Sequence, residues 1–194
     1  GVPGLQFVGV ELQPGYADLA RRNSEINGCD LDVIEADLNA LPDDLRQRHF
    51  DHVIANPPYY RAGAHSPASD TGRSIALGED TPLIDWITVA AKRLAPRGFL
   101  HMIQKADRLP DMLTACEGKL GSIEVLPLSA RAGRQAELVI LSARKGGRAA
   151  FRLHAPLILH AGERHEKDGD SYTEAVSAVL RQAAPLPRNL CHRQ

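Results

Sequence analysis

Short apolar runs alternate with amphipathic segments through the first two thirds of the chain. Each apolar run has the length of a buried strand, and most segments between runs carry apolar residues at helical spacing. This alternation of strand, helix and strand is typical of a parallel sheet with helices packed on it. The expected strands are residues 5–10, 31–36, 50–56 and 99–103, and the expected helices lie within residues 14–27, 41–48, 82–94 and 107–118.

The pattern changes in the last third of the chain. Two strand-like runs, residues 122–128 and 137–143, are separated by a segment in which no helix fits, so we expect an antiparallel hairpin there. An extended segment over residues 151–159 and a last helix over residues 173–183 follow. The sequence therefore predicts a parallel α/β sheet that ends in an antiparallel pair of strands.

The composition is that of an ordinary globular protein, with 43% hydrophobic and 24% charged residues. A length of 194 residues is enough for one domain with a real core. We expect that domain over residues 1–184 and a C-terminal tail over residues 185–194. The net charge of −1 gives no global nucleic-acid signature, so any contact with RNA must come from a local patch.

The cysteines and the hydropathy indicate the compartment. Cys29, Cys116 and Cys191 are dispersed along the chain, which favours a reducing compartment over a disulfide framework or a zinc site. No apolar run approaches the ~20 residues that a membrane-spanning helix needs. No secretory signal is visible at the start. We therefore expect a cytoplasmic protein without a membrane partner.

The most informative stretch is Asn56-Pro57-Pro58-Tyr59, which follows an apolar strand directly. Both prolines end the strand because neither has an N–H for a sheet ladder, and each fixes its own φ. The Asn56 side-chain oxygen and the Pro57 carbonyl are two acceptors suited to a planar amino group, and Tyr59 can stack on the ring that carries it. The alternative is a rigid corner with a capping asparagine.

This stretch resembles the motif of the S-adenosylmethionine-dependent amino methyltransferases, in which Asn/Asp-Pro-Pro-Tyr/Phe/Trp follows the fourth strand of a doubly wound, Rossmann-like sheet and binds the target amine. The resemblance implies catalytic roles for Asn56, Pro57 and Tyr59 and S-adenosylmethionine as cofactor. It also implies that Glu11 binds the cofactor's ribose and Asp37 its adenine, with Asn56 adjoining the cofactor. Ligands of open α/β sheets bind at the carboxyl ends of strands, where these residues fall. A helix cap or a solvated acid is the alternative for each carboxylate.

Basic residues gather in the hairpin and just after it. A short window contains a single acid, Glu137, and such a local patch suits the sequence-independent binding of RNA phosphates. A solvated charged face is the alternative. The predicted RNA-binding residues are Arg131, Arg134, Arg144, Lys145 and Arg148.

A second group, His154, His160 and His165, has no zinc-site spacing and no nearby cysteine, so we expect no metal there.

Within the resembled class, four stretches are similar to the bacterial tRNA adenine-amino methyltransferases that act beside the anticodon of a valine tRNA. These are residues 94–99, 131–134, 156–160 and 172–174. The resemblance implies tRNA as partner and an adenine amino group as methyl acceptor. The same motif also serves enzymes that act on guanine in ribosomal RNA, adenine in DNA or a release-factor glutamine, and these remain alternatives.

One departure from the family concerns the start of the chain. The family's first strand and its Gly-rich cofactor turn have no counterpart, because Gly1-Val2-Pro3-Gly4 is too short for them. We expect a natural protein that is longer at its N-terminus, or a neighbouring chain that supplies the strand, and weak cofactor binding by these residues alone. A non-catalytic RNA-binding remnant is the other hypothesis. Residues 61–79 form a long Gly/Ser/Ala/Pro-rich loop, which is either a substrate-ordered lid or a surface loop.

Overall fold

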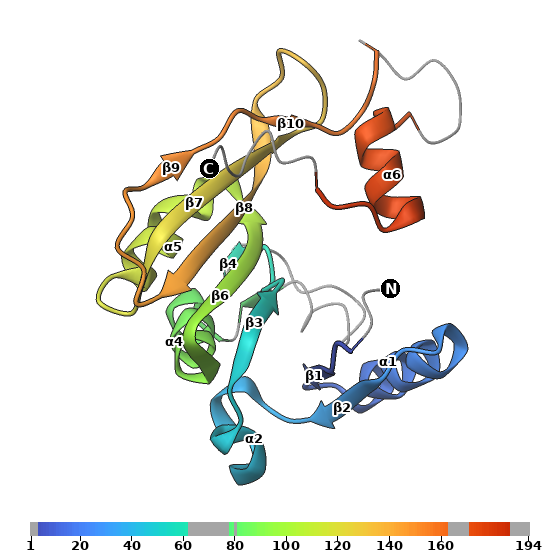
Figure 1. Ribbon diagram of the computed structural model, residues 1–194, viewed down its shortest axis with the longest axis vertical. Coiled ribbons are helices and arrows are strands. Elements are labelled where there is room, and N and C mark those ends of the chain that lie inside the picture. The colour runs from blue at the N-terminus through green and yellow to red at the C-terminus, as the bar shows by residue number, and fades with distance from the viewer. Residues whose placement is uncertain (1–3, 62–77, 80, 163–170, 187–194) are drawn as a thin grey trace. The chain divides into compact units, whose positions relative to one another are not determined.

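The computed structural model describes residues 4–61, 78–79, 81–162 and 171–186 (Figure 1). Its chain divides into two compact units, Gly1–Arg48 and His49–Gln194. Most of the loop over residues 61–79, expected to be either a lid or a surface loop, namely residues 62–77, lies outside the described residues. No described helix is long and apolar enough to cross a membrane.

The first unit is a strand–helix–strand arrangement with short helices after it. Strands β1 and β2 pair in parallel from Phe7↔Leu31 to Glu11↔Glu35. Helix α1 begins at Pro14, whose missing N–H costs nothing at the first helical position, and ends at Gly28 in the left-handed conformation with φ 59°. Its elements are β1 (Phe7–Glu11), α1 (Pro14–Asn27), β2 (Leu31–Glu35), η1 (Leu38–Ala40) and α2 (Asp43–Gln47).

The second unit is built on a mixed sheet in the order β10-β7-β8-β6-β3, with β9 also paired to β7. Strand β3 runs parallel to β6, whereas β8 is antiparallel to both β6 and β7. This confirms the predicted α/β sheet that ends in an antiparallel hairpin. The strands are β3 (Phe50–Ala55), β6 (Leu94–Lys105), β7 (Leu120–Ser129), β8 (Ala136–Lys145), β9 (Arg152–Leu153) and β10 (Leu157–Ile158), and a separate parallel pair is β4 (Tyr60–Arg61) with β5 (Gly78–Glu79).

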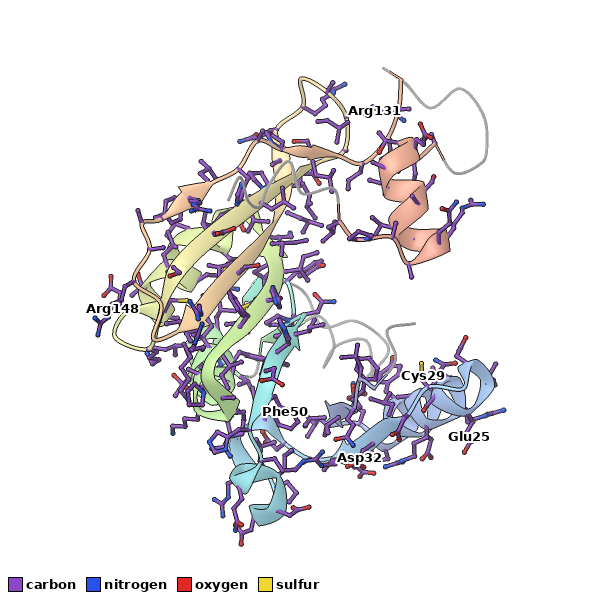
Figure 2. All side chains as sticks on the ribbon, viewed as in Figure 1. Glu25, Cys29, Asp32, Phe50, Arg131 and Arg148 are labelled. Atoms are coloured by element: carbon purple, nitrogen blue, oxygen red, sulfur yellow. The ribbon has the colours of Figure 1, made fainter. Side chains whose placement is uncertain are left out.

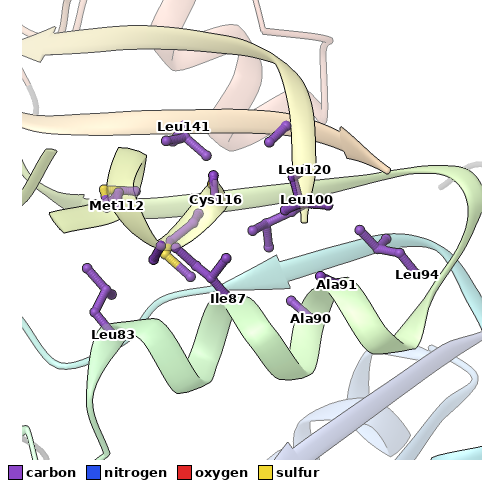
Figure 3. Close-up of a cluster of buried hydrophobic side chains, with 14 of the residues drawn as sticks. Leu83, Ile87, Ala90, Ala91, Leu94, Leu100, Met112, Cys116, Leu120 and Leu141 are labelled. Atoms are coloured by element: carbon purple, nitrogen blue, oxygen red, sulfur yellow. The ribbon is translucent and has the colours of Figure 1, made fainter. Parts of the chain in front are cut away.

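Two helices cover one face of this sheet and form the core with it (Figure 3). Helix α4 (Leu83–Arg93) turns Ile87 and its neighbours toward the strands, and α5 (Leu109–Cys116) adds Met112 and Cys116 as the periodicity predicted. Residues of this cluster with no exposed surface are Ile87, Leu94, Leu100, Met102, Met112, Cys116, Val125, Leu141 and Ala143.

The C-terminal segment folds back onto β7. Strands β9 and β10 both pair in parallel with it. Helix α6 (Glu174–Gln182) is preceded by Thr173, whose hydroxyl accepts a hydrogen bond from the Val176 N–H as an N-cap. His160 and Tyr172 form an isolated bridge with stacked rings, which ties the segment before α6 to the residues after β10.

One boundary differs from the sequence expectation. Strand β6 begins at Leu94, directly after helix α4 ends at Arg93, whereas the expected strand began at residue 99. The chain bulges there rather than stopping: Arg97 has φ 70°, and a Cβ on Gly98 would approach the Asp51 carbonyl oxygen to 2.9 Å.

Strand pairing leaves one edge of β1 and one edge of β3 without a partner strand among the described residues. The apolar side chain of Ile54 in β3 is 82% exposed, which is unusual for the middle of a strand.

The two described cysteines differ enough in environment to predict their reactivity. Cys116 lies in the core, and its burial raises the pKa of the thiol to about 11, an effect that Lys119 partly offsets. Cys29 is exposed. Because the thiolate is the nucleophile, iodoacetamide at pH 8 is expected to alkylate Cys29 readily and Cys116 only after unfolding. Peptide mass analysis with and without urea checks this, and equal labelling of both in the folded protein would contradict the burial of Cys116.

Candidate active site

The Asn-Pro-Pro-Tyr turn (residues 56–59) begins directly after β3, at its carboxyl end. Asn56 is exposed, and its side chain makes no hydrogen bond within the described part of the chain. Pro57 is fully buried, and Tyr59 is half-buried. The turn therefore presents an unengaged carboxamide on a firmly packed base, the arrangement that a polar ligand with N–H donors needs.

A residue that the sequence analysis did not select holds this turn. Gln104, next to last in β6, has no exposed surface, and its Nε2 donates to the Pro58 carbonyl oxygen at 3.0 Å. Its distance to the Pro57 oxygen is 3.5 Å, at the outer limit of a hydrogen bond. A signal was present in the sequence, because Gln104 is a polar residue at the end of an apolar strand, as Asn56 is.

The first unit carries the two carboxylates predicted for the cofactor. Glu11 is the last residue of β1, Asp37 follows β2, and the parallel pairing brings both to the same end of this two-stranded sheet. Glu11 Oε1 accepts from the Gln13 N–H at 2.9 Å, and Asp37 Oδ1 accepts from the Asn39 N–H at 2.8 Å. Asp37 thus caps η1, which was its alternative role, whereas Glu11 binds a backbone N–H in the turn before α1.

Each of these hydrogen bonds uses only part of its carboxylate. An ionised carboxylate has two oxygens and about four lone-pair positions, so one such bond leaves acceptor capacity on each acid. Ribose hydroxyls and an adenine amino group are donors that such acceptors suit. The residues present therefore fit the adenosine part of S-adenosylmethionine chemically.

The predicted basic patch is not one cluster in space. Arg131 and Arg134 lie in the turn between β7 and β8, whereas Arg144, Lys145 and Arg148 lie at or beyond the far end of β8. The two groups are about 30 Å apart along a strand of that length, and Figure 2 shows Arg131 and Arg148 at opposite ends of the hairpin. Residues close in sequence separate here because an extended strand runs between them.

The pairing of β6 with β8 shows which of the two groups of basic residues lies at the same end of the sheet as the Asn-Pro-Pro-Tyr turn. Lys105, at the carboxyl end of β6, pairs with Leu138 at the start of β8. The β7–β8 turn is therefore at the same end of the sheet as the carboxyl ends of β3 and β6. Arg131 and Arg134 share that end with Asn56, and the other three basic residues occupy the opposite end.

Several of these basic side chains already bind backbone carbonyls. Arg131 Nη1 donates to the carbonyl oxygens of Ala161 and Gly162 at 2.6 and 2.8 Å, which anchors the segment after β10. At the opposite end, Arg144 donates to the Arg97 carbonyl and Lys145 to that of Leu94. Arg134 and Arg148 are exposed.

The histidines have structural neighbours. His154 Nε2 lies 3.1 Å from a Glu124 carboxylate oxygen, and His160 Nδ1 lies 3.2 Å from the Ser171 hydroxyl. His165 lies outside the described residues. Among the described side chains there is no group of three or more potential metal ligands.

Comparisons with known proteins were made by sequence and by structure. No protein-family model matches the chain. It is 31% identical over 118 residues to the tRNA1(Val) (adenine(37)-N6)-methyltransferase of Porphyromonas gingivalis, an alignment that covers 57% of this chain and 44% of that protein. It is 40% identical over 58 residues to the release factor glutamine methyltransferase of Geobacter sulfurreducens, covering 30% of this chain and 19% of that protein.

Among solved structures, the chain resembles a predicted O-methyltransferase, protein Atu636 from Agrobacterium tumefaciens. The TM-score is 0.66 at 26% identity, with 89% of this chain and 75% of that chain covered. The chain spans less than half the length of the curated relatives named above. Its mixed α/β sheet and its sequence similarity are both those of S-adenosylmethionine-dependent methyltransferases, to which the chain is similar.

Proposed function

We propose that the protein transfers a methyl group from S-adenosylmethionine to the exocyclic amino group of an adenine in the anticodon region of a tRNA. The observation that carries the proposal is the exposed Asn56 carboxamide, which has no hydrogen-bond partner among the described residues and follows β3 beside a buried Pro57. The similarity to tRNA1(Val) adenine-N6 methyltransferases supports the choice of substrate.

The chain's own groups act on the nucleophile. The Asn56 Oδ1 and the Pro57 carbonyl oxygen accept hydrogen bonds from the two N–H groups of the adenine amine. In the free base, the lone pair of this amine is delocalised into the ring. Holding both hydrogens favours a pyramidal nitrogen with its lone pair directed at the methyl donor. Tyr59 stacks on the base, which contributes roughly 1–3 kcal/mol per base. Positioning of this kind can lower the barrier by several kcal/mol.

S-adenosylmethionine supplies an electrophilic methyl group on a sulfonium. In this proposal Glu11 accepts hydrogen bonds from its ribose hydroxyls, and Asp37 accepts one from its adenine amino group. Both carboxylates retain acceptor capacity after their local hydrogen bonds, which supports these roles. The proposal needs no general base with a shifted pKa.

The direct test is a methyl-transfer assay of the full-length protein with isotopically labelled S-adenosylmethionine. Total tRNA and an unmodified transcript of a valine tRNA are the substrates, and nucleoside mass analysis locates the label. We expect label in N6-methyladenosine. Label in a guanosine product, or no label in either RNA, would contradict the proposed substrate.

A glutamine amide of a release factor is a second candidate acceptor, favoured by the similarity to the release factor glutamine methyltransferase. A glutamine side chain also presents a planar –NH2 to the Asn-Pro-Pro-Tyr turn. A release factor added to the same assay separates the two, because the label would then appear in methylglutamine and not in RNA.

The division of the basic residues predicts different salt dependences. Arg134 lies at the end of the sheet that carries Asn56, so we expect Arg134→Ala to weaken tRNA binding and to reduce the slope of log K against log salt by about 1, the value of one lost phosphate contact. Arg148→Ala, a matched change at the opposite end, should leave the slope unchanged. Filter binding over a salt series measures both, and equal losses would show that the whole hairpin contacts RNA.

A further inference from the structure

We propose that Gln104 is a positioning residue of the methyl-transfer site, because its buried amide fixes the backbone of the Asn-Pro-Pro-Tyr turn. This inference rests on the proposed function. Gln104 reaches across from β6 to a turn 46 residues earlier in the chain and donates from Nε2 to the Pro58 carbonyl oxygen at 3.0 Å.

The burial of Gln104 is complete, and both ends of its amide are engaged. Its Oε1 accepts from the Lys105 N–H at 2.9 Å, while Nε2 serves the turn. A buried polar side chain costs free energy unless it is satisfied, and an apolar residue at this strand position would avoid that cost. The amide therefore has a use that a leucine or methionine would not provide.

The turn needs an outside donor because of its own sequence. Pro57 and Pro58 have no N–H, so the turn cannot be held by a sheet ladder through these residues. Its carbonyls remain acceptors, and in a buried setting they require donors. Gln104 supplies them from the neighbouring strand, and the Pro58 carbonyl that it binds belongs to the peptide leading into Tyr59.

Gln104 bonds mainly to the carbonyl that the proposed mechanism does not use. The Nε2 distance is 3.0 Å to the Pro58 oxygen but 3.5 Å to the Pro57 oxygen, so the strong bond falls on the carbonyl that the mechanism does not use. A carbonyl oxygen has two lone pairs, and Pro57 keeps capacity for the amine of a substrate. Gln104 thus orients the acceptor pair and the Tyr59 ring without competing with the substrate.

The test combines kinetics with a direct readout of the turn in the full-length protein. Gln104→Met keeps the volume and removes the donors. Gln104→Glu also keeps the acceptor for the Lys105 amide, and it serves if the first variant folds poorly. Ser129→Ala is the matched control, since the Ser129 hydroxyl is equally buried and has no hydrogen-bond partner in the described structure. Urea unfolding is measured for each variant.

We expect kcat of both Gln104 variants to fall about 10- to 100-fold, as it does when a catalytic group is misplaced. The measurement is made at a temperature where each variant is folded. The KM for S-adenosylmethionine should be nearly unchanged. In protein labelled with 3-fluorotyrosine, the Tyr59 signal, assigned with Tyr59→Phe, should shift or broaden while that of Tyr172 stays in place. Ser129→Ala should change neither quantity.

An unchanged Tyr59 signal would overturn the positioning role, and so would a loss of kcat no greater than the loss of folded protein. The fluorine readout does not depend on turnover. If the wild type methylates no substrate, the proposed function fails, while a Tyr59 signal that responds to Gln104→Met still shows that the amide holds the turn.

Discussion

Replacing Asn56 by alanine is expected to lower kcat for methyl transfer about 10³-fold in the full-length protein, close to the detection limit. The change removes one of the two acceptors that hold the amine, and losing a single positioned hydrogen-bonding group at a reacting centre typically costs about 10²–10³-fold. Folding should be nearly unaffected, because Asn56 is exposed and its side chain makes no hydrogen bond to the described residues. A labelled-methyl assay and urea unfolding measure the two effects.

Two comparisons sharpen this expectation. Asn56→Asp keeps a side-chain oxygen acceptor at the same place, so it should retain more activity than Asn56→Ala. Asn23→Ala changes an exposed asparagine in α1 and should leave activity at the wild-type level. Full turnover by Asn56→Ala would refute the role assigned to this carboxamide and leave the turn as a rigid corner.

The largest expected effect on stability comes from Leu141→Ala in the second unit. Leu141 has no exposed surface and lies in β8, where its backbone neighbours are Met102 of β6 and Val125 of β7. Removing a buried leucine side chain and leaving a cavity typically costs about 2–5 kcal/mol. That is a large fraction of the ~5–15 kcal/mol by which a typical domain is stable.

A leucine on the same sheet provides the matched control. Leu153 in β9 is 64% exposed, and Leu153→Ala should change the free energy of unfolding by no more than about 0.5 kcal/mol. Urea unfolding followed by circular dichroism gives both values, with the slope m expected to stay constant. Similar losses for the two variants would contradict the position of the core between α4, α5 and the sheet.

Local signals in the sequence were sufficient for most elements of the fold. Pro14 and Gly28 mark the two ends of α1, and the structure confirms both bounds. The hairpin followed from a segment between two apolar runs in which no helix fitted, and β7 and β8 confirm it. These predictions succeeded because proline, glycine and apolar periodicity act on the conformation of their own neighbourhood.

Closeness in sequence did not predict closeness in space where an extended strand lies between two residues. Arg131 and Arg148 are close in sequence, but β8 carries them to opposite ends of the sheet. Strand β6 begins at Leu94, before the expected residue 99, because the bulge at Arg97 lets the strand include Pro96 and Gly98 and continue beside β3.

The sequence by itself determined the class of the sheet, the ends of its helices and the position of Asn56, Pro57 and Tyr59 directly after a buried strand. Only the tertiary structure decided what holds that turn: Gln104 contacts it through strand pairing between β3 and β6, across 46 residues of chain. The physical reason is that two prolines remove the local hydrogen bonds of the turn. Its support must come from a distant donor, and no local pattern names that donor.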